Sequence, residues 1–405
     1  MAHQLSEEEM NSPPDLSTLS VTSSANTPPT LETPPPPPPP LDSPTPPHRS
    51  HDPTNNLKRS DPFQFGSRYL LPSDDPYEFN AWDHVETDST YKAHAEAMYA
   101  SQRASPVSAF DKTRFNTDPA KWWNKFYTNN TSNFFKDRKW LRQEFPILDA
   151  LTKAQSTPAK ILEVGAGAGN TAFPILAANE NPNLVLHACD FSTKAVELIR
   201  SSPAYSPQHI QASVWDIASD TLPENVHENS IDVVLLVFIF SALSPQQWRQ
   251  AVRNVFRVLK PGGEVCFRDY GRGDLAQVRF RKGRWMEENF YVRGDGTRVY
   301  FFDEEELRGM WGGGMWERQQ DGDGDFLQKT TTLSHSVDDA VLSSLDASSD
   351  FTQSFEIVSL GVDRRLLINR QSKVKMYRCW MQGRFQKPDA VKSPEPAVSA
   401  CDGHF

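Results

Sequence analysis

The middle of the chain alternates between segments that predict β-strands and segments that predict α-helices. Short apolar runs that predict strands span residues 160–165, 184–190, 211–216, 231–240 and 264–271. Helix-like segments lie between them, and two of these begin after Ser192 and Ser244, a residue type that often caps helices. Strands that alternate with helices at this spacing predict a doubly wound α/β fold with a parallel sheet, which binds ligands at the carboxyl ends of its strands.

A glycine-rich loop follows the first predicted strand. The sequence EVGAGAGN places Gly165, Gly167 and Gly169 at alternate positions, so the backbone can turn tightly and approach a ligand closely. A dinucleotide-binding loop carries its third glycine one residue later, where this chain has Asn170. The offset disfavours a nicotinamide cofactor. The alternative to a ligand-binding role is that these glycines only form a structural turn.

Acidic residues at the ends of the next two strands indicate which ligand the loop binds. Asp190 ends the second strand, where a carboxylate can accept hydrogen bonds from the two hydroxyls of a ribose. Asp216 follows the third strand and could meet an adenine amino group, with apolar contacts from Ile217 and Val237. Together with the glycine loop, these residues predict a site for S-adenosylmethionine.

Composition divides the rest of the chain. Fifteen of the 32 prolines precede residue 54, among Ser, Thr and Asn, so we expect residues 1–60 to form a disordered tail. Residues 312–350 are rich in Gly, Ser and Asp and predict a flexible insert, and residues 389–405 predict a second disordered end. The expected domains are therefore an extension over residues 61–150 and an α/β domain over residues 151–388 that contains the glycine loop.

Several classes of protein are disfavoured by the sequence. No apolar run approaches the roughly 20 residues that span a bilayer. The first ten residues contain three glutamates and no arginine, unlike a signal or transit peptide. We therefore expect a cytoplasmic protein, and the nucleus is a second candidate location. The four cysteines lack the C-x-x-C spacing of a zinc site or a disulfide framework, and we predict no metal.

Charge is distributed unevenly along the chain. The formal net charge is −10, but Lys and Arg gather in residues 121–142, 268–298 and 363–387. An acidic protein with local basic segments is compatible with a phosphate-bearing substrate. Ordinary solvated faces are the alternative on charge alone.

Longer motifs give the chain a family resemblance. From about residue 65 to residue 388, the insert apart, it resembles the tRNA N3-methylcytidine methyltransferase family. The segments that carry the resemblance are FGSRYL (65–70), NAWDHVE (80–86), WNKFY (123–127), FFKDRKWLRQEFP (134–146), FRDYGRGDLAQVRF (267–280) and NFYVRGDGTRVYFF (289–302). The first two look more like the branch associated with threonine tRNA. The chain departs from the family pattern at Ala166 and Ala168, two small residues that spare the glycines.

This resemblance implies a fold, a reaction and partners. The fold is the seven-stranded, Rossmann-like class I sheet of S-adenosylmethionine-dependent methyltransferases, preceded by a helical extension that binds RNA. The reaction forms N3-methylcytidine at cytidine 32 in the anticodon loop of threonine or serine tRNAs, with a seryl-tRNA synthetase as a candidate helper. A methyltransferase that acts on a small molecule or a protein is the alternative.

The resemblance also implies roles for cofactor-binding and catalytic residues. Trp123 and Tyr127 resemble an aromatic lid over the cofactor, whose remaining binding residues match Gly165, Gly167, Asp190, Asp216, Ile217 and Val237. The product ring is cationic, so a nearby carboxylate would stabilise developing charge. We expect Asp269 to have this role and Tyr270 to shape the base pocket. A salt bridge from Asp269 to Arg268 or Arg272 is the alternative.

Two basic segments are candidates for RNA contact. Asp295 and Gly296 suit the turn of a β-hairpin, whose arms would carry Tyr291, Arg293, Arg298 and Tyr300 toward RNA phosphates and unpaired bases. The FFKDRKW segment supplies Lys136, Arg138 and Lys139, and Arg272 is a further candidate. An adhesion role for the Arg-Gly-Asp tripeptide is disfavoured, because nothing in the sequence indicates secretion.

Overall fold

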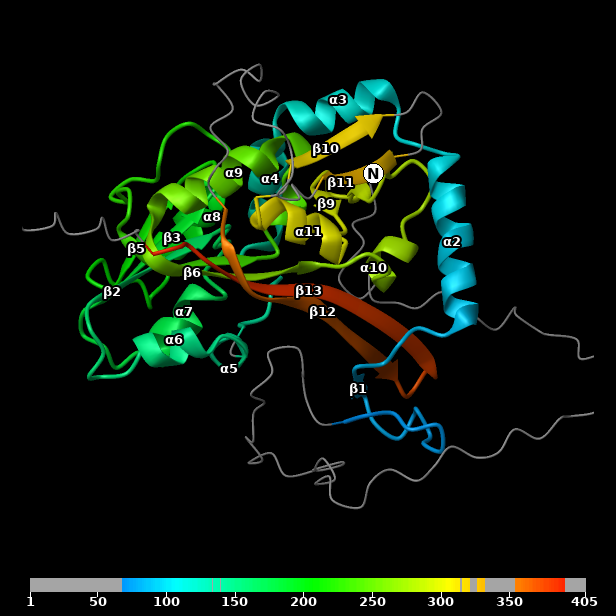
Figure 1. Ribbon diagram of the computed structural model, residues 1–405, viewed down its shortest axis with the longest axis horizontal. Helices are drawn as coiled ribbons and strands as arrows, with labels where there is room; N and C mark the ends of the chain where they lie inside the picture. The colour runs from blue at the N-terminus through cyan, green and yellow to red at the C-terminus, as the bar shows by residue number, and fades with distance from the viewer. Residues whose placement is uncertain are drawn as a thin grey trace, which may run out of the picture.

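The computed structural model contains a central sheet of eight strands in the order β1-β12-β13-β6-β5-β2-β3-β4 (Figure 1). It describes residues 68–132, 134–138, 140–313, 315–320, 326–331 and 354–389. The predicted tail (1–60), Lys139, most of the predicted insert and all of the second predicted end except residue 389 therefore lie outside the described residues.

The five predicted strands form the parallel part of the sheet. They are β2 (Ala159–Val164), β3 (Leu184–Asp190), β4 (Ile210–Val214), β5 (Ile231–Val237) and β6 (Leu259–Tyr270). β6 begins five residues before its predicted start. Leu259 pairs with Ile231 and the register then shifts, so the segment containing Pro261 and two glycines fits into the strand as an irregularity.

Antiparallel strands extend the sheet beyond β6. They are β13 (Val374–Gln386), β12 (Glu356–Asn369) and, at the edge, β1 (Ala81–Asp83). The family resemblance implies seven strands, and the central sheet contains the five predicted strands together with β12 and β13. The eighth strand, β1, belongs to the N-terminal extension. Its three residues pair with Arg365 to Leu367 of β12 and so attach the extension to the edge of the sheet.

Helices cover both faces of the sheet, and the strands alternate between two cores. Leu162 and Val234 face a cluster that includes residues of α9 (Pro245–Val258) and α11 (Glu304–Trp311). Ile161 and Val233 face a second cluster with α6 (Pro146–Leu151), α7 (Ala172–Ala177) and α8 (Thr193–Arg200). The near-continuous apolar runs in the sequence reflect this burial on two faces.

The N-terminal extension is largely helical, as the resemblance implies. Its helices are α2 (Ser89–Arg103), α3 (Ala109–Thr117), α4 (Pro119–Asn130) and α5 (Leu141–Glu144), followed by α6. Gln102 anchors α2, because its side-chain amide donates to the carbonyl oxygens of Gln277 and Phe280 at 3.1 and 3.0 Å. These acceptors lie in and just after α10 (Leu275–Val278), beside α2 in Figure 1.

Two smaller sheets complete the described elements. β7 (Trp285–Glu287), β8 (Phe290–Val292) and β9 (Arg298–Tyr300) form one, and a short 3-10 helix, η2 (Phe240–Ala242), lies near β9. β10 (Met315–Gln320) and β11 (Phe326–Thr331) pair antiparallel within the segment predicted to be a flexible insert. These two stretches are therefore regular rather than irregular. No helix among the described residues is long and apolar enough to cross a membrane.

Candidate active site

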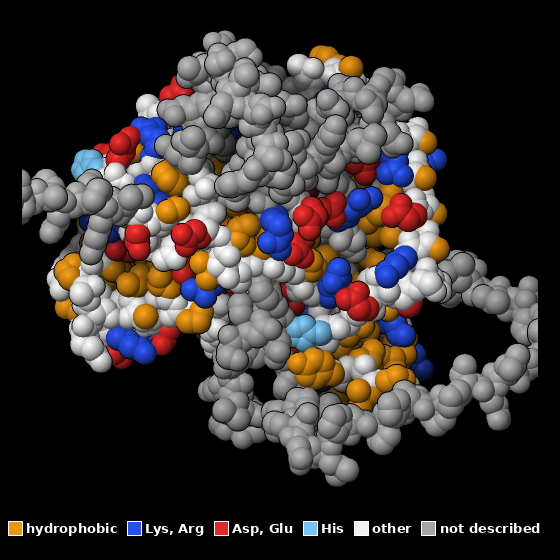
Figure 2. Space-filling model, viewed as in Figure 1, with side chains coloured by type: hydrophobic (Ala, Val, Ile, Leu, Met, Phe, Trp, Pro, Cys, Tyr) orange, Lys and Arg blue, Asp and Glu red, His pale blue; other side chains and the backbone are white. Residues whose placement is uncertain are grey.

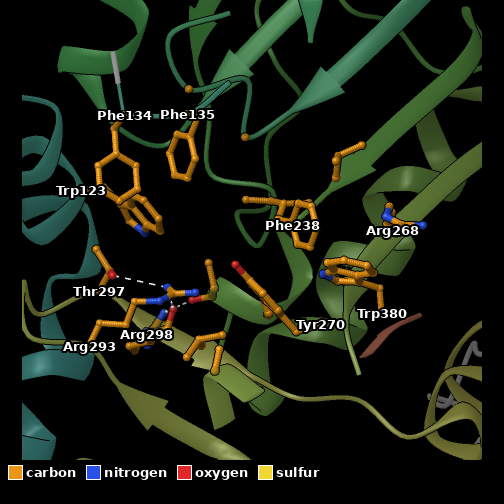
Figure 3. Close-up of a pocket in the computed structure, with 18 of the residues that line it drawn as sticks. Trp123, Phe134, Phe135, Phe238, Arg268, Tyr270, Arg293, Thr297, Arg298 and Trp380 are labelled. Carbon is orange, nitrogen blue, oxygen red and sulfur yellow. Dashed lines mark hydrogen bonds between the residues drawn. The ribbon is translucent and has the colours of Figure 1, made fainter. Parts of the chain in front are cut away.

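A cavity of about 950 Å³ opens at the carboxyl ends of the parallel strands. Its wall combines α4, the glycine loop, the ends of β3, β5 and β6, the β8–β9 hairpin, and one face of β12 and β13. Figure 3 shows aromatic side chains and arginines converging on this space from several elements. All eight residues predicted to bind the cofactor line it: Trp123, Tyr127, Gly165, Gly167, Asp190, Asp216, Ile217 and Val237.

The glycine loop depends on the absence of side chains. Gly165, Gly167 and Gly169 have φ angles of +67°, +57° and +89°, a region that favours glycine. A β-carbon on Gly167 would lie 2.5 Å from the hydroxyl oxygen of Tyr127, and one on Gly165 would lie 2.6 Å from a methyl carbon of Ile239. The loop can therefore present bare backbone to a ligand beneath Tyr127.

Helix α4 is fixed over the loop by a residue that sequence reasoning did not single out. The side-chain oxygen of Asn124 accepts hydrogen bonds from Ser192 Oγ at 2.7 Å and from the Lys194 backbone at 3.1 Å, at the start of α8. The rings of Trp123 and Tyr127 stack with centroids 6.1 Å apart. The predicted aromatic lid is thus tied to the helix that follows the Asp190 strand.

Asn170 connects the glycine loop to the FFKDR segment. Its side-chain amide donates to the Phe135 carbonyl at 3.1 Å and to Asp137 Oδ1 at 3.2 Å, and its carbonyl accepts from the Arg138 backbone at 2.8 Å. Arg138 also donates to Thr171 Oγ1 at 3.0 Å. Asn170, which stands where a dinucleotide-binding loop has glycine, therefore holds the FFKDR segment against the glycine loop. Two basic residues of that segment, Lys136 and Arg138, line the cavity.

Asp190 faces the glycine loop with its carboxylate already oriented. Its Oδ2 accepts from the Gly167 backbone N–H and its Oδ1 from that of Ser192, each at 2.8 Å. Burial raises the pKa of Asp190 to about 6, against the opposing effect of these two hydrogen bonds. A carboxylate oxygen accepts more than one hydrogen bond, so Asp190 retains capacity for two ligand hydroxyls.

S-adenosylmethionine fits the residues at this end of the cavity. The loop at Gly165 and Gly167 exposes backbone where any β-carbon would occupy the space next to Tyr127 and Ile239. Asp190 and Asp216 supply hydrogen-bond acceptors at the ends of two neighbouring strands. Buried Ile217 supplies apolar surface. No group of three or more His, Cys, Asp or Glu side chains among the described residues could hold a metal ion.

Asp269 does not lie where the prediction places it. Its side chain is 0% exposed, and the residue is absent from the cavity wall, whereas Arg268 and Tyr270 on either side line it. Alternation along β6 explains this, because successive strand residues point to opposite faces. Asp269 accepts from the backbone N–H groups of Ser241 at 2.9 Å and Tyr270 at 2.8 Å. Asp269 therefore lies behind the cavity wall in this structure, a position that does not support the direct contact with the base that the prediction gives it.

The alternative salt bridges for Asp269 are also absent. Arg268 pairs with Asp363 at 2.5 Å, and Arg272 pairs with Asp303 at 3.6 Å. Burial raises the pKa of Asp269 to about 6, although hydrogen bonds from Ser241 and Tyr270 oppose that rise. Its observed role is to connect the end of β6 to the loop that follows β5.

Tyr270 lines the cavity together with Phe238, which sequence reasoning missed. Their ring centroids are 4.9 Å apart, and the Arg293 guanidinium lies 5.8 Å from the Tyr270 centroid. Figure 3 shows Tyr270 pointing into the space between Phe238 and the arginines. Phe238 has a φ of +60°, a strained conformation for a bulky residue, and such strain gathers at functional sites. Its place after a buried strand was the signal available in the sequence.

The β8–β9 hairpin forms as predicted, but most of its arms are buried. Tyr291 donates to Gln102 Oε1 at 3.0 Å and Tyr300 donates to Glu306, and the two tyrosines are 2% and 0% exposed. The expectation that these tyrosines stack on RNA bases is therefore wrong for this structure. Both are core residues because the hairpin packs against α2 and α11 rather than projecting into solvent.

The arginines predicted to bind RNA occupy different environments. Arg293 lines the cavity, but Arg298 is 4% exposed and donates to the Ala242 carbonyl at 3.1 Å and Asn116 Oδ1 at 3.0 Å. Burial lowers the pKa of Arg298 to about 10. It lies in the cavity wall rather than on an exposed arm. Arg272 lines a separate pocket beside α2, so the main cavity does not include it.

Basic side chains line the cavity in more than one place. Lys136 and Arg138 lie near the glycine loop, where Asp190 and Asp216 supply acidic groups, and the wall formed by α10, β12 and β13 carries Arg279, Arg365 and Arg378. On the face drawn in Figure 2, by contrast, Lys and Arg are interspersed with Asp and Glu. The cavity, rather than this outer face, brings basic side chains together.

The fold and the cofactor end of the cavity define a methyltransferase. Residues 162–265 match the family model described as "Methyltransferase domain". This class uses S-adenosylmethionine as its methyl donor, and that is the cofactor of this chain.

Comparison with known proteins narrows this class. The chain is 43% identical over 323 residues to the tRNA N(3)-methylcytidine methyltransferase trm140 of Schizosaccharomyces pombe, covering 80% of this chain and 92% of that protein. It is 40% identical to the tRNA N(3)-methylcytidine methyltransferase Mettl2 of Drosophila melanogaster, covering 82% of this chain and 90% of that protein. The chain therefore belongs to the tRNA N(3)-methylcytidine methyltransferase family.

A longer relative is also similar. The tRNA(Thr) (cytosine(32)-N(3))-methyltransferase of Saccharomyces cerevisiae is 45% identical over 337 residues, which cover 82% of this chain but 47% of that protein. The chain thus spans about half the length of this relative.

Proposed function

We propose that this protein methylates N3 of cytidine 32 in the anticodon loop of threonine tRNA, serine tRNA or both. The observation that carries the proposal is the 43% identity across 92% of a relative named as a tRNA N(3)-methylcytidine methyltransferase. The cavity supports it, because an aromatic and arginine-lined region adjoins the predicted cofactor end. The name of the Saccharomyces cerevisiae relative supports position 32 as the methylated position and threonine tRNA as a substrate.

The chemistry asks the protein mainly to position its substrates. N3 of cytosine carries its own lone pair, so no strong general base is needed, and orientation supplies much of the acceleration. S-adenosylmethionine supplies the methyl group when it is bound. Glycine-loop backbone, Asp190 and Asp216 would hold the cofactor, while Trp123 and Tyr127 would exclude water from above.

The base end of the cavity would hold the cytidine. The target base must leave its stacked position in the loop, as in other enzymes that act on bases. Phe238 and Tyr270 offer ring faces 4.9 Å apart, and Arg293 offers N–H donors beside them. Without a carboxylate from Asp269, stabilisation of the cationic product would come from ring faces, which attract cations.

The proposal has a direct test. Purified protein, S-adenosylmethionine and unmodified threonine and serine tRNA transcripts are incubated, and digested RNA is analysed for 3-methylcytidine by mass spectrometry. The matched control is a transcript with uridine at position 32. Product that depends on cytidine 32 supports the function, and methylation elsewhere overturns the assigned position.

We further propose that seryl-tRNA synthetase assists with serine tRNA. Adding the synthetase to the same reaction should raise the rate for serine tRNA and leave that for threonine tRNA unchanged. An equal rate with and without synthetase would overturn this part of the proposal.

A further inference from the structure

Three arginines gather at the far end of the cavity from the glycine loop. Arg365 of β12 and Arg378 of β13 are direct cross-strand partners, and Arg279 follows α10. All three line the same cavity. Like charges directly opposite each other across two strands are destabilising, so this arrangement requires a compensating interaction.

Carboxylates contact both arginines of the pair through their Nε atoms. Asp274 lies 2.9 Å from Arg378 Nε, and Asp83 and Asp363 lie 3.4 and 3.8 Å from Arg365 Nε. Within the described residues, the terminal nitrogens of Arg378 donate no hydrogen bond, so four N–H donors stay available to a ligand. Arg378 is also close enough to Arg279 that its charge, after burial, lowers the Arg279 pKa.

The surroundings of the three arginines favour a nucleotide over a simple anion. Residues of β12 and β13 that point to this face alternate in sequence, and Leu367 pairs with Met376 beside the arginines. Trp380 lies one strand period beyond Arg378 and is the cross-strand partner of Tyr270. The Arg378 guanidinium lies 4.9 Å from the Trp380 ring centroid. Apolar and aromatic surface therefore connects the arginines to the base end of the cavity.

We propose that Arg279, Arg365 and Arg378 bind a phosphodiester of the RNA strand next to the methylated cytidine. This inference rests on the proposed function, because it assigns the cytidine to the Tyr270 end of the cavity. Two or three arginines around one phosphate give charge-assisted, geometrically specific contacts. The clamp would hold the strand while the cytidine is turned into the cavity.

The test combines one protein change with single neutral phosphates in the RNA. Arg279→Gln is the first variant, because Arg279 is partly exposed and lies at a helix end. The RNA is the threonine tRNA anticodon stem-loop, made with one methylphosphonate at a time at each loop phosphate. Arg257→Gln is the matched control, since Arg257 of α9 pairs with Glu228 and does not line the cavity.

The clamp predicts a specific pattern. Arg279→Gln should raise KM for RNA by about tenfold, reduce the slope of log affinity against log salt by about one and leave cofactor affinity unchanged. A methylphosphonate at one particular loop position should raise KM of the wild-type enzyme for RNA by about as much as Arg279→Gln does. The same methylphosphonate should not raise the KM of Arg279→Gln any further. Arg257→Gln should match wild type in each measurement. Arg378→Lys, which keeps the charge but loses the planar fork, should show the same loss at the same phosphate.

Other outcomes separate the two proposals. If the wild-type protein forms no 3-methylcytidine on any tRNA, the proposed function itself fails. If the wild type is active and the losses from the variants and from every methylphosphonate multiply independently, the function stands and the clamp is overturned.

Discussion

The Tyr127 hydroxyl lies so close to Gly167 that a β-carbon there would be 2.5 Å from its oxygen. This contact connects the lid helix α4 to the glycine loop at the point where the loop turns through a φ of +57°. Asp190 accepts a hydrogen bond from the same glycine at 2.8 Å. Lid, loop and the predicted ribose-binding carboxylate therefore meet at one residue.

Gly167→Ala should disrupt cofactor binding through this contact. The added methyl group must displace Tyr127 and also carries a backbone strain of roughly 1–2 kcal/mol. We expect the Kd for S-adenosylmethionine to rise at least about tenfold, which corresponds to ~1.4 kcal/mol. Isothermal titration calorimetry with the cofactor measures this directly.

Gly283→Ala is the matched control for that change. Gly283 has a φ of +74°, but a β-carbon there would meet nothing within 4 Å. It should lose about the same stability to backbone strain and keep wild-type cofactor affinity. Equal cofactor affinity in both variants would show that the Tyr127 contact has no part in binding.

Cofactor affinity should depend on pH through Asp190. Burial raises its pKa to about 6, and ligand hydroxyls that donate to the carboxylate favour the charged form. Binding therefore releases a proton below pH 6, and the affinity should rise as pH increases, by up to tenfold per unit, and then level off above about 6. Titrations from pH 5 to 8 test this. Asp190→Asn should bind weakly with a flat profile, and an unchanged slope in that variant would assign the effect to another group.

Sequence patterns predicted the sheet well because its signals are local. The runs at 184–190 and 231–237 are mostly apolar, so burial on both faces of the sheet could be predicted without knowing which elements pack against them. Most residues predicted to bind the cofactor lie at or just after the ends of the parallel strands, whereas Trp123 and Tyr127 lie in α4 and were suggested by the family resemblance. The direction of a single side chain was harder: Asp269 and Tyr270 are adjacent, and alternation sends them to opposite faces.

Tertiary packing decided the features that sequence reasoning missed. The tyrosines of the β8–β9 hairpin look exposed in a basic, aromatic segment, but α2 and α11 bury them. Arg365 and Arg378 meet only because β12 and β13 pair in one register. That register depends on long-range contacts, and no local spacing encodes it.

Asp269→Asn should lower turnover without altering cofactor binding. The carboxylate of Asp269 accepts from two backbone N–H groups, those of Ser241 and Tyr270. An asparagine has one acceptor oxygen, and its NH₂ group would face the other backbone N–H, so one of the two hydrogen bonds is lost. The loop that carries Phe238 is then held less firmly. A buried hydrogen bond to a charged group contributes about 1.5–3 kcal/mol, so kcat should fall about 10- to 100-fold. Single-turnover assays at saturating cofactor measure the change.

The pH profile distinguishes positioning from general destabilisation. Since the Asp269 pKa is about 6, wild-type kcat should decline as pH falls through 6, and Asp269→Asn should lack that decline. Asp232→Asn is the control, because Asp232 also accepts a backbone N–H, from Lys160 at 2.8 Å, but lies at the other end of the sheet. A similar loss of kcat in Asp232→Asn would mean that stability, not positioning, explains both variants.

The buried pair of Arg268 and Asp363 should be required for stability. Arg268 donates to Asp363 at 2.5 Å and Gln382 at 2.6 Å, and its guanidinium lies 5.1 and 4.9 Å from the ring centroids of Trp140 and Trp380. Arg268→Met leaves the fully buried Asp363 without this partner, which should cost about 3–5 kcal/mol of unfolding free energy.

Urea denaturation tests this cost against an exposed pair. Lys194→Ala removes the partner of Glu197, which is 62% exposed, and should change the free energy of unfolding by less than about 1 kcal/mol. The double variant Arg268→Met with Asp363→Leu should regain most of the lost stability, because no buried charge is left uncompensated. If the double variant is no more stable than Arg268→Met, the loss arises from the contacts of Arg268 with the two tryptophans, and the charge pair is not its cause.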